Sequence, residues 1–555
     1  MKLLYSILLI FIIGIAPAFP QIYVAPNGDD TNPGTITQPL ESIQQAQTLA
    51  APGDTVFIRG GLYQVREDQI SQIQQNLFAC ISFLNKSGLP GQTIKYWAYP
   101  GETPVFDFSN VAPADRRVVG IWVDQGAEYI HIKGIEMTGI QVSILTHTES
   151  YCVYSRGSNN IFEQISMHDN LGTALRHYRG GNNLFLNCDA YNNHDNVSED
   201  GLGSNTDGFG CHPNPGGTGN VFRGCRAWFN SDDGFDIIRA DESVLFENCW
   251  AFYNGFSTSF QSLGDGNGFK AGGYAYDPAN QIPNPVPQNT VRFCVAVRNK
   301  ASGFYSNHHL AGNNWYNNTA YQNNSNFNMV NRESPQTGNI WVDGYDHVLK
   351  NNLSYKPFGF GTHTAYIDTA QNTLENNSFD LPITLSDADF ISLDHSLLTA
   401  PRKADGSLPE IDFMRPVQGS AITDAGVDIG FPFSGNAPDL GSIETNYTTN
   451  IESLEENMAV KIALFQNYPN PFNPYTNIPY TLSEPAYIKL SVFNIFGQKI
   501  RTLVWQYQSP GEFMVSWNGE NELGISVASG IYFYRLSASN SSGSYSIQKR
   551  MMLLR

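Results

Sequence analysis

Between residues 160 and 330, polar and apolar positions recur in short blocks. A complete block has an asparagine, a cysteine five positions on, an alanine seven on and a second asparagine ten on, as in the segments 183–193, 220–230 and 289–299. The second asparagine recurs at residues 170, 193, 230, 254, 299 and 323, in steps of 23, 37, 24, 45 and 24. A basal step with occasional longer intervals is typical of a β-solenoid whose coils carry insertions at one corner.

In a β-solenoid each short strand pairs in parallel with the equivalent strand one coil away, so equivalent residues stack at roughly 4.8 Å. We expect the recurring asparagines at tight turns, where asparagine tolerates the left-handed conformation, with their stacked amides forming an internal ladder. The cysteines at positions 188, 225, 249 and 294 then form a column of buried thiols rather than a disulfide framework. An odd total of seven cysteines agrees with this interpretation.

The two ends of the chain follow other patterns. Residues 22–58 read as strand, turn, one short helix and strand, and such a helix would cap the open end of the solenoid. The repeat fades after about residue 330. Alternating runs at 487–493 and 530–536 predict a small β-sandwich. The fold class is therefore all-β: a parallel β-helix with an N-terminal helical cap, followed by a C-terminal β-sandwich.

The predicted organisation has four parts. Residues 1–21 have the charge, apolar core and small-residue order of a secretory signal peptide, and the apolar run is too short for a comfortable membrane span. Residues 22–450 form the β-helix domain, 451–464 an acidic linker, and 465–555 the sandwich. We therefore expect a secreted, monomeric protein with no membrane span in its mature form.

The net charge of −19 and the pI near 4.9 argue against nucleic acid or an anionic membrane surface as partner. The same charge also disfavours a polyanionic polysaccharide, unless a divalent cation lies between the two sets of carboxylates.

A second repeat within the solenoid carries candidate chemistry. Four segments align in it, namely 207–210, 233–236, 267–270 and 302–305. Their glycine and phenylalanine columns indicate a bend and an inward core residue. The flanking columns are polar: Asp207, Asp233 and Asn267 share one, and Asp236 and Lys270 share the other. Lys270 should therefore lie about one coil from Asp236.

Stacking of the coils gathers the carboxylates of Asp207, Asp232, Asp233 and Asp236 on one face. Asp232 and Asp233 point to opposite sides of an extended chain, so this requires a bend between them. Four carboxylates repel one another unless a cation compensates, and hard oxygen ligands favour Ca²⁺. Such residues are also ordinary turn formers, and a lysine on a solenoid is usually solvated. Their coincidence in adjacent coils favours a functional site.

This constellation fits β-elimination in a polyuronate. The proton at C5 lies α to the carboxylate, so its removal builds negative charge that a divalent cation stabilises. Lys270 would take that proton as a neutral amine. Free lysine has a pKa near 10.4, so nearby positive charge or burial must lower its pKa, or activity must peak at alkaline pH.

The residues at this point resemble polysaccharide lyase family 9, over roughly residues 22–445. The resemblance is sharpest at 205–208, 230–236 and 266–270. It implies a right-handed parallel β-helix, with a calcium site at Asp207, Asp232, Asp233 and Asp236 and with Lys270 as the base. It also implies pectate or polygalacturonate as substrate, although some members act on other uronate-containing polymers.

The last 90 or so residues are similar to the C-terminal sorting domain of type IX secretion. The motifs are Tyr468–Phe472, Phe496-Gly497, Gly530–Tyr532 and the basic-apolar end. That resemblance implies passage across the outer membrane through the type IX machinery.

Two alternatives remain open. An inverting polygalacturonase also uses paired carboxylates on a β-helix, but its Gly-His-Gly and Arg-Ile-Lys motifs do not occur here. A non-catalytic β-helix adhesin or glycan-binding protein would give Lys270 no special role. Four further residues could line a substrate groove or be surface filler: Arg239, Arg298, Tyr305 and His308.

Overall fold

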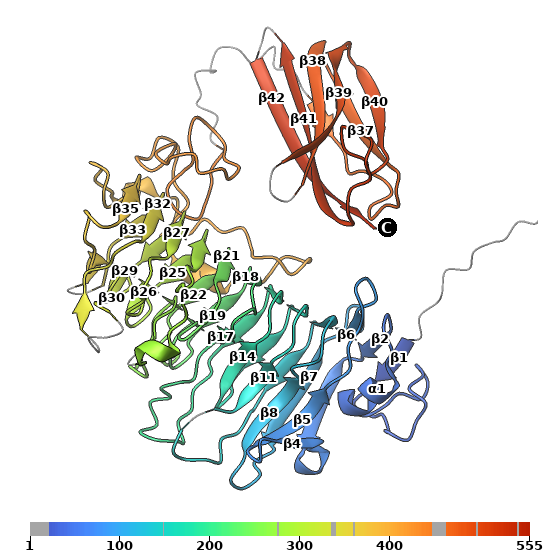
Figure 1. Cartoon of the computed structure of the whole chain (residues 1–555), viewed down its shortest axis with the longest axis vertical. Helices are drawn as coiled ribbons and strands as arrows, with labels where there is room; N and C mark the ends of the chain where they lie inside the picture. The colour runs from blue at the N-terminus through green and yellow to red at the C-terminus, as the bar shows by residue number, and fades with distance from the viewer. Residues whose placement is uncertain are drawn as a thin grey trace, which may run out of the picture. The chain divides into compact units, whose positions relative to one another are not determined.

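The recurring blocks of the sequence form the coils of a parallel β-helix (Figure 1). The computed structural model describes residues 21–147, 149–274, 277–334, 340–358, 361–446, 462–494, 498–540 and 543–554. The predicted signal segment, apart from residue 21, and most of the predicted linker lie outside these ranges. The described chain divides into two units, with the boundary between Tyr447 and Thr448.

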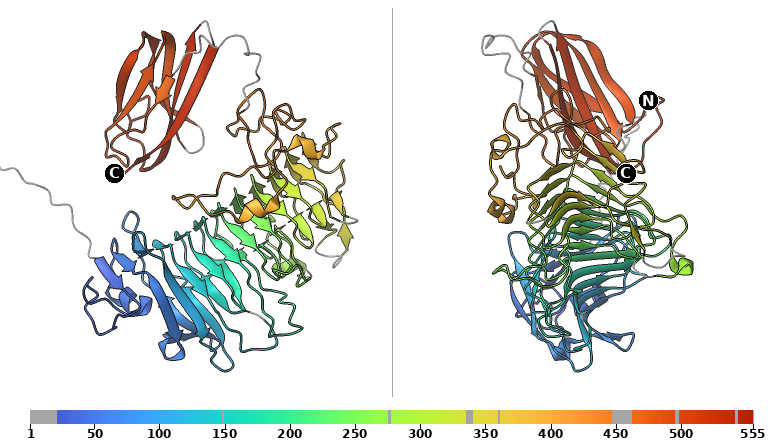
Figure 2. Two further views of the ribbon diagram at one scale, coloured as in Figure 1. Left: turned by 180° about the vertical axis from the view of Figure 1, so that it is seen from behind. Right: turned by 90° about the vertical axis from the view of Figure 1, so that its left-hand side faces the viewer.

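Three long sheets form the β-helix in the described part of the chain, and Figure 2 shows their stacked strands from behind and from the side. The twelve-stranded sheet contains β1 (Gln21–Val24), β2 (Thr55–Ile58), β6 (Ile94–Ala98), β9 (Ile130–Lys133), β12 (Ile161–Glu163), β15 (Leu184–Leu186), β18 (Asn220–Arg223), β21 (Val244–Glu247), β24 (Thr290–Arg292), β27 (Asn314–Tyr316), β32 (Val348–Lys350) and β35 (Thr373–Glu375). The ten-stranded sheet contains β3 (Gly61–Arg66), β7 (Pro104–Asn110), β10 (Glu136–Thr138), β13 (Ser166–His168), β16 (Asp189–Tyr191), β19 (Arg226–Trp228), β22 (Trp250–Phe252), β25 (Val295–Val297), β28 (Thr319–Tyr321) and β33 (Leu353–Tyr355).

The eleven-stranded sheet positions the candidate site. From the N-terminal end of the solenoid it contains β4 (Gln72–Gln74), β5 (Phe78–Leu84), β8 (Arg117–Val123), β11 (Tyr151–Ser155), β14 (Thr173–Arg179), β17 (Phe209–Pro213), β20 (Phe235–Asp236), β23 (Phe269–Lys270), β26 (Ser302–Tyr305), β29 (Ser325–Asn328) and β34 (Thr362–Ala365). Its strands pair in parallel except β4 with β5. The predicted all-β parallel β-helix is confirmed.

The predicted asparagine ladder is present inside the solenoid. The side-chain amide of Asn193 donates to Asn230 Oδ1 at 2.8 Å, and that of Asn230 donates to Asn254 Oδ1 at 3.0 Å. The same contact joins Asn254 to Asn299 at 2.9 Å. Each buried amide therefore satisfies its neighbour one coil away, which stabilises the turn at every coil.

The left-handed conformation occurs at the turns of the ladder. It is adopted by the residue immediately before each ladder asparagine, with φ between 51° and 61° at Asp169, Asn192, Phe229, Tyr253, Arg298 and Gln322. The preceding residue turns the chain, and the asparagine that follows can then direct its amide inward. The ladder asparagines therefore lie at the turns, as expected, without themselves adopting the left-handed conformation that asparagine tolerates.

The core lies inside the solenoid and contains the predicted columns. Phe209, Phe235, Phe269 and Phe304 are buried, and successive rings stack with centroids 5.1, 4.8 and 5.2 Å apart. All seven cysteines are buried free thiols, including the column at 188, 225, 249 and 294. Because these columns align equivalent residues coil by coil, they fix the vertical register of the outward-facing positions between them.

A short helix covers the N-terminal end of the core, as predicted. Helix α1 (Ile43–Leu49) buries Ile43 and Ala46, and the Ser42 hydroxyl caps it by accepting the Gln45 N–H at 3.0 Å. Four short 3₁₀ helices lie in connections among the described residues: η1 (Glu67–Gln69), η2 (Ala279–Gln281), η3 (Asp387–Asp389) and η4 (His395–Thr399). Among the described residues, none of the helices has the length and apolar character that crossing a bilayer needs.

Residues 378–446 pack along the outer face of the ten-stranded sheet, which the sequence did not predict. Phe390, Leu398 and Phe413 join a buried cluster with Trp250 and Phe252 of β22. Farther along the sheet, the Arg402 guanidinium pairs with Asp189 of β16 at 2.6 Å. The segment therefore returns toward the middle of the solenoid and covers apolar side chains on that face.

The second unit contains two antiparallel sheets around its own core. One sheet contains β36 (Ile462–Leu464), β37 (Thr476–Leu482) and β40 (Gly511–Trp517); the other contains β38 (Ala486–Asn494), β39 (Lys499–Gln508), β41 (Gly530–Asn540) and β42 (Gly543–Leu553). Leu490, Val492 and Trp517 are among the buried residues between them. This agrees with the predicted C-terminal β-sandwich.

Candidate active site

The outer surface of strands β20 and β23 carries the polar columns that the sequence predicts. The register pairs Phe235 with Phe269 and Asp236 with Lys270. It also pairs Lys270 with Tyr305 in the next coil. Because the phenylalanines point into the core, the paired Asp236 and Lys270 point outward.

A bend before β20 brings neighbouring aspartates to the same side. The chain turns at Ser231 and Asp232 rather than continuing as an extended strand. One carboxylate oxygen each from Asp207, Asp232 and Asp233 therefore lie within 4.8 Å of one another. Asp236 is not part of this close group and lies instead on the lysine side of it, with its Oδ2 3.2 Å from Lys270 Nζ.

Backbone amides hold the aspartates in place. Asp232 accepts the N–H groups of Asn205 at 2.7 Å and Asp265 at 2.9 Å. Asp233 Oδ1 accepts both the N–H of Asn267 at 2.7 Å and its side-chain amide at 2.8 Å. Since the donors come from adjacent coils, the solenoid stacking itself orients the carboxylates.

Lys270 lies against this cluster. Its Nζ is 3.0 Å from Asp233 Oδ2, which is buried and accepts no hydrogen bond in the described structure. The lysine side chain is 13% exposed and that of Asp233 is 0% exposed. The arrangement places one mostly buried amine between two buried carboxylates, at the edge of a surface that a ligand can reach.

Burial and the neighbouring charges shift the pKa values of the residues in this cluster. Burial, with the neighbouring Asp233 carboxylate, raises the pKa of Asp232 to about 8. Burial and the Asp236 carboxylate raise the pKa of Asp207 well above its ordinary value. For Lys270, burial lowers the pKa, but the surrounding carboxylates outweigh it and raise the pKa above its ordinary value. The aspartates thus lack enough positive charge for all of them to ionise.

The donor set fits a hard divalent cation. Three carboxylates meet within a few ångströms, and Asp233 Oδ2 has an ion contact with Lys270 Nζ but accepts no hydrogen bond from the described residues. All candidate ligands are oxygens, which Ca²⁺ prefers in proteins. The residues present could therefore hold Ca²⁺ through Asp207, Asp232 and Asp233, with Asp236 beside them.

The four residues that the sequence offered as possible groove residues lie in different places. Tyr305 is the register neighbour of Lys270, and its ring lies 6.0 Å from that of His308. Arg239 is largely exposed and pairs with Asp277. Arg298 donates to His395 of the 378–446 segment, on the outer face of the ten-stranded sheet. Tyr305 and His308 are therefore next to Lys270, whereas Arg298 lies on a different sheet.

Sequence reasoning missed Asp265. Its N–H donates to Asp232, and burial together with the Asp233 carboxylate raises the pKa of its own side chain. It stands between Gly264 and Gly266, so it reads as a turn residue. The sequence signal that could have identified Asp265 is its position two residues before Asn267, which belongs to the aligned repeat.

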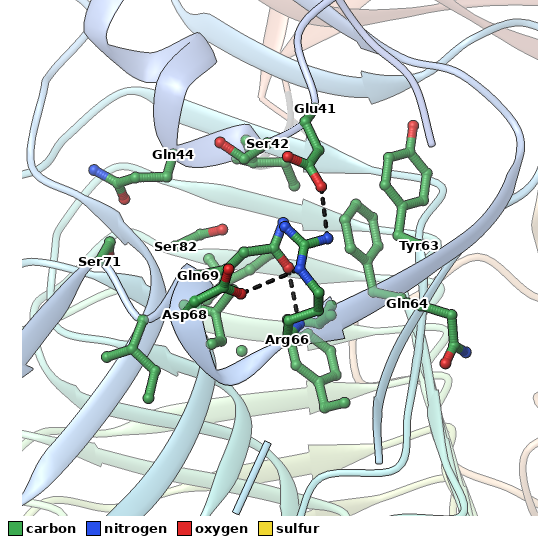
Figure 3. Close-up of a pocket in the computed structure, with 18 of the residues that line it drawn as sticks. Glu41, Ser42, Gln44, Tyr63, Gln64, Arg66, Asp68, Gln69, Ser71 and Ser82 are labelled. Carbon is green, nitrogen blue, oxygen red and sulfur yellow. Dashed lines mark hydrogen bonds and ion pairs between the residues drawn. The ribbon is translucent and has the colours of Figure 1, made fainter. Parts of the chain in front are cut away.

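A cavity of about 470 Å³ lies elsewhere, at the N-terminal end of the solenoid (Figure 3). Arg66 at its mouth pairs with Glu41 at 2.8 Å and with Asp68 at 3.1 Å, so its charge is satisfied within the chain. The cavity wall includes β5 and β8, several strands from β23 in the sheet order. It is therefore separate from the aspartate–lysine cluster.

The family described as "Pel9A-like, right handed beta helix region" matches residues 22–352. The chain belongs to this family. Pectate lyase L of Dickeya chrysanthemi is 36% identical to this chain over 433 residues, which cover 76% of this chain and 90% of the relative. Pectate lyase PEL9 of Emericella nidulans is 31% identical, covering 72% of this chain and 93% of the relative.

Two solved structures resemble this lyase closely. A rhamnogalacturonan lyase is 41% identical with a TM-score of 0.69, covering 72% of this chain and 96% of that structure. The pectate lyase Pel9A is 32% identical with a TM-score of 0.61, covering 77% of this chain and 97% of that structure. The enzyme is thus a polysaccharide lyase, which favours the lyase interpretation over the hydrolase and adhesin alternatives.

The second unit matches a different model. Residues 475–542 match the FlgD Ig-like domain. The match agrees with an immunoglobulin-like sandwich and is silent on transport, so the type IX sorting role stays a prediction. Its Phe496-Gly497 motif lies outside the described residues.

Proposed function

We propose that this enzyme is a secreted, calcium-dependent pectate lyase that cleaves 1,4-linked galacturonan by β-elimination, with Lys270 as the base. The observation that carries the proposal is the contact of Lys270 Nζ with Asp233 Oδ2 at 3.0 Å, beside a cluster of three carboxylates. A base next to a cation-binding cluster is the arrangement that proton abstraction α to a carboxylate requires.

The aspartates have one role in this mechanism, which is to hold the cation. Ca²⁺ bound by Asp207, Asp232, Asp233 and Asp236 would supply positive charge that offsets both these carboxylates and the charge developing on the substrate carboxylate. The backbone N–H groups of Asn205, Asp265 and Asn267 keep the ligands oriented before substrate binds.

Lys270 has the role of the base. With the aspartates' charge offset, burial is the remaining influence on its pKa, and burial favours the neutral amine. The Lys270 Nζ lone pair takes the C5 proton, the electron pair of the C5–H bond forms the C4–C5 double bond, and the C4–O4 bond breaks. The products are a 4,5-unsaturated uronate end and a free hydroxyl on the departing sugar, which receives a proton from solvent.

Rhamnogalacturonan is the second candidate substrate. It is favoured by the 41% identity to a rhamnogalacturonan lyase over 72% of this chain, against 32% to the pectate lyase Pel9A. Elimination at its galacturonate residues uses the same lysine and aspartates. The residues of the cluster do not distinguish the two polymers, because both present a uronate carboxylate at the reacting sugar.

The deciding experiment is a product assay on both polymers. Purified enzyme is incubated with polygalacturonate or with rhamnogalacturonan, and the ultraviolet absorbance of the unsaturated product is followed with and without chelator. Absorbance that depends on calcium supports the lyase proposal. The polymer that is cleaved faster is then the preferred substrate. Reducing sugar released without ultraviolet absorbance would contradict elimination.

We also infer that the 465–555 sandwich directs export through the type IX machinery, after an N-terminal signal has directed the chain to the periplasm. The proposal rests on the motifs at 468–472 and 530–532 and on the basic-apolar end. In a host with that machinery, deletion of 465–555 should keep the lyase inside the cell. Export at wild-type level by the truncated chain would contradict the inference.

A further inference from the structure

Three arginines lie on the outer side of the eleven-stranded sheet, N-terminal to the aspartate–lysine cluster. Arg176 and Arg179 belong to β14, and Arg156 follows the end of β11. All three side chains are partly exposed. We call this set the arginine cluster.

Among the described residues, no ion pair joins the arginine cluster to a carboxylate. Its hydrogen bonds go to neutral oxygens: Arg156 and Arg179 both donate to Gln125 Oε1, at 3.3 and 3.0 Å, and Arg176 donates to the Tyr151 hydroxyl at 3.0 Å. The Glu149 carboxylate acts on Arg176 through space and is ion-paired with Arg117. The Nε atoms of all three arginines are buried and have no hydrogen-bond partner. Three adjacent cations without an ion-paired carboxylate are unexpected in a chain with a net charge of −19.

The guanidinium groups are held in place by aromatic rings. The Arg156 guanidinium carbon lies 5.7 Å from the centre of the Trp122 ring, and that of Arg176 lies 5.9 Å from the centre of the Tyr151 ring. Trp122 and Tyr151 belong to a buried cluster that is separate from the solenoid core. The arginines are therefore positioned before any ligand binds, which lowers the entropy cost of binding.

Arg179 also has a strained backbone. Its φ of 102° lies in the region that side chains rarely adopt, at a cost on the order of 1–3 kcal/mol. Neighbouring Gly180 has no room for a Cβ, since that atom would lie 2.0 Å from the Gly157 carbonyl oxygen. Such strain persists where the surrounding structure imposes it, and it directs the Arg179 side chain toward Gln125 and Arg156.

The register links this cluster to the proposed base. Arg176 pairs with Gly210, Gly210 with Asp236, and Asp236 with Lys270. These are three strand spacings, or roughly 14 Å along the sheet. Gly210 adds no side chain of its own to the outer surface between Arg176 and Asp236, and the His212 ring and the Arg176 side chain border the space above it. An extended ligand that runs along the sheet from the arginine cluster to Lys270 would therefore pass over His212.

We propose that Arg156, Arg176 and Arg179 form a subsite for a carboxylate of the polysaccharide chain, several strand spacings from the bond that is cleaved. This rests on the proposed function. The planar guanidinium matches a carboxylate with two parallel hydrogen bonds, which the terminal Nη groups of these partly exposed side chains would donate. The subsite also explains how an acidic enzyme binds a polyanion away from the calcium site.

Steady-state kinetics on polygalacturonate test the subsite. Arg156→Gln and Arg179→Gln should each raise KM roughly tenfold, the loss expected when a hydrogen bond to a charged group is removed, with little change in kcat. The dependence of KM on salt should become weaker in both variants, because fewer charges are screened. The matched control is Arg223→Gln on β18, whose arginine is ion-paired with Glu247, and its kinetics should equal those of the wild type.

Two outcomes would overturn the subsite: KM and its salt dependence unchanged in both variants, or KM raised equally by Arg223→Gln. If the wild type releases no unsaturated product from any uronate polymer, the proposed function fails by itself. Migration through gels containing polygalacturonate then tests the subsite alone. Retardation of the wild type but not of the Arg156→Gln, Arg179→Gln double variant supports it, and equal migration overturns it.

Discussion

Lys270 Nζ lies 3.0 Å from Asp233 Oδ2, although the sheet register pairs Lys270 with Asp236. The bend at Ser231 and Asp232 produces this contact, because it turns the Asp233 carboxylate toward the outer surface of the next coil. The lysine therefore partly neutralises two aspartates at once, and the cluster still contains more negative charge than one amine can offset.

Calcium should stabilise the β-helix domain. A ligand that binds only the folded state adds about 2.7 kcal/mol at a concentration of 100 times its Kd. The wild type should therefore melt at a higher temperature with calcium than with chelator. Asp207→Asn keeps an oxygen for the Asp233 N–H, which Asp207 accepts at 3.2 Å, but removes the charge. It should change the metal-free stability by less than about 1 kcal/mol and lose most of the calcium effect. A full calcium shift in this variant would contradict the assigned ligand set.

Asp189 should be a major source of stability outside the active site. It lies mostly buried between Arg226 at 2.9 Å and Arg402 at 2.6 Å, and the second contact joins the 378–446 segment to β16. Asp189→Ala leaves two mostly buried guanidiniums without their partner and should cost about 3–5 kcal/mol in urea unfolding. The control is Glu410→Gln, which breaks an exposed pair with Lys403 and should leave the unfolding midpoint in urea almost unchanged. Equal effects of the two variants would refute the assignment.

Removing one asparagine of the buried ladder should also lower the stability of the β-helix. The Asn254 side chain accepts from Asn230 and donates to Asn299 and to the Ala227 carbonyl, all in the buried interior. Asn254→Ala leaves several of these groups unpaired, at about 1–3 kcal/mol each. We expect a loss of at least about 2 kcal/mol by chemical denaturation, without any change in the calcium shift. A loss below about 0.5 kcal/mol would show that the ladder contributes little.

The columns of the solenoid could be predicted from sequence because they repeat. Asparagine, cysteine and phenylalanine recur at fixed offsets, and parallel stacking then places Asp236 beside Lys270. The bend at Asp232 was needed for the site, but turn-forming residues alone do not specify the direction of a bend. Asp265 escaped notice because it reads as an ordinary turn residue.

Other parts of the fold carry no repeating signal. The first coils, β1 to β10, lack the asparagine and cysteine columns that recur every coil later in the chain. The closing segment 378–446 packs through contacts such as Arg402 with Asp189, which join residues more than 200 positions apart. Such pairs are set by tertiary packing, so spacing along the chain cannot reveal them.

Buried histidines should make the fold acid-sensitive. Burial lowers the pKa of His177 and of His309 to about 4, from an ordinary value of 6.5. Above pH 6.5 both are neutral in the folded and unfolded chain. As the pH falls from 6.5 toward 4, the unfolded chain takes up protons that the folded chain does not, so stability falls by on the order of 3 kcal/mol per histidine.

Urea unfolding between pH 7 and pH 4 measures this effect. His309→Gln keeps an acceptor for the Gly273 N–H and a donor for the Pro287 carbonyl but cannot be protonated. Its stability should fall less steeply than that of the wild type between pH 6.5 and pH 4. Parallel pH curves for the two proteins would exclude His309 as a source of the acid sensitivity.

The central claim is that Lys270 is the base of an elimination, and Lys270→Ala with the unsaturated-product assay tests it most directly. The matched control is Lys350→Ala, whose lysine pairs with Glu375 on the twelve-stranded sheet. On the preferred uronate polymer with calcium, we predict no measurable ultraviolet product from folded Lys270→Ala protein and wild-type rates from Lys350→Ala. Unsaturated product formed by Lys270→Ala at a substantial fraction of the wild-type rate would contradict the account.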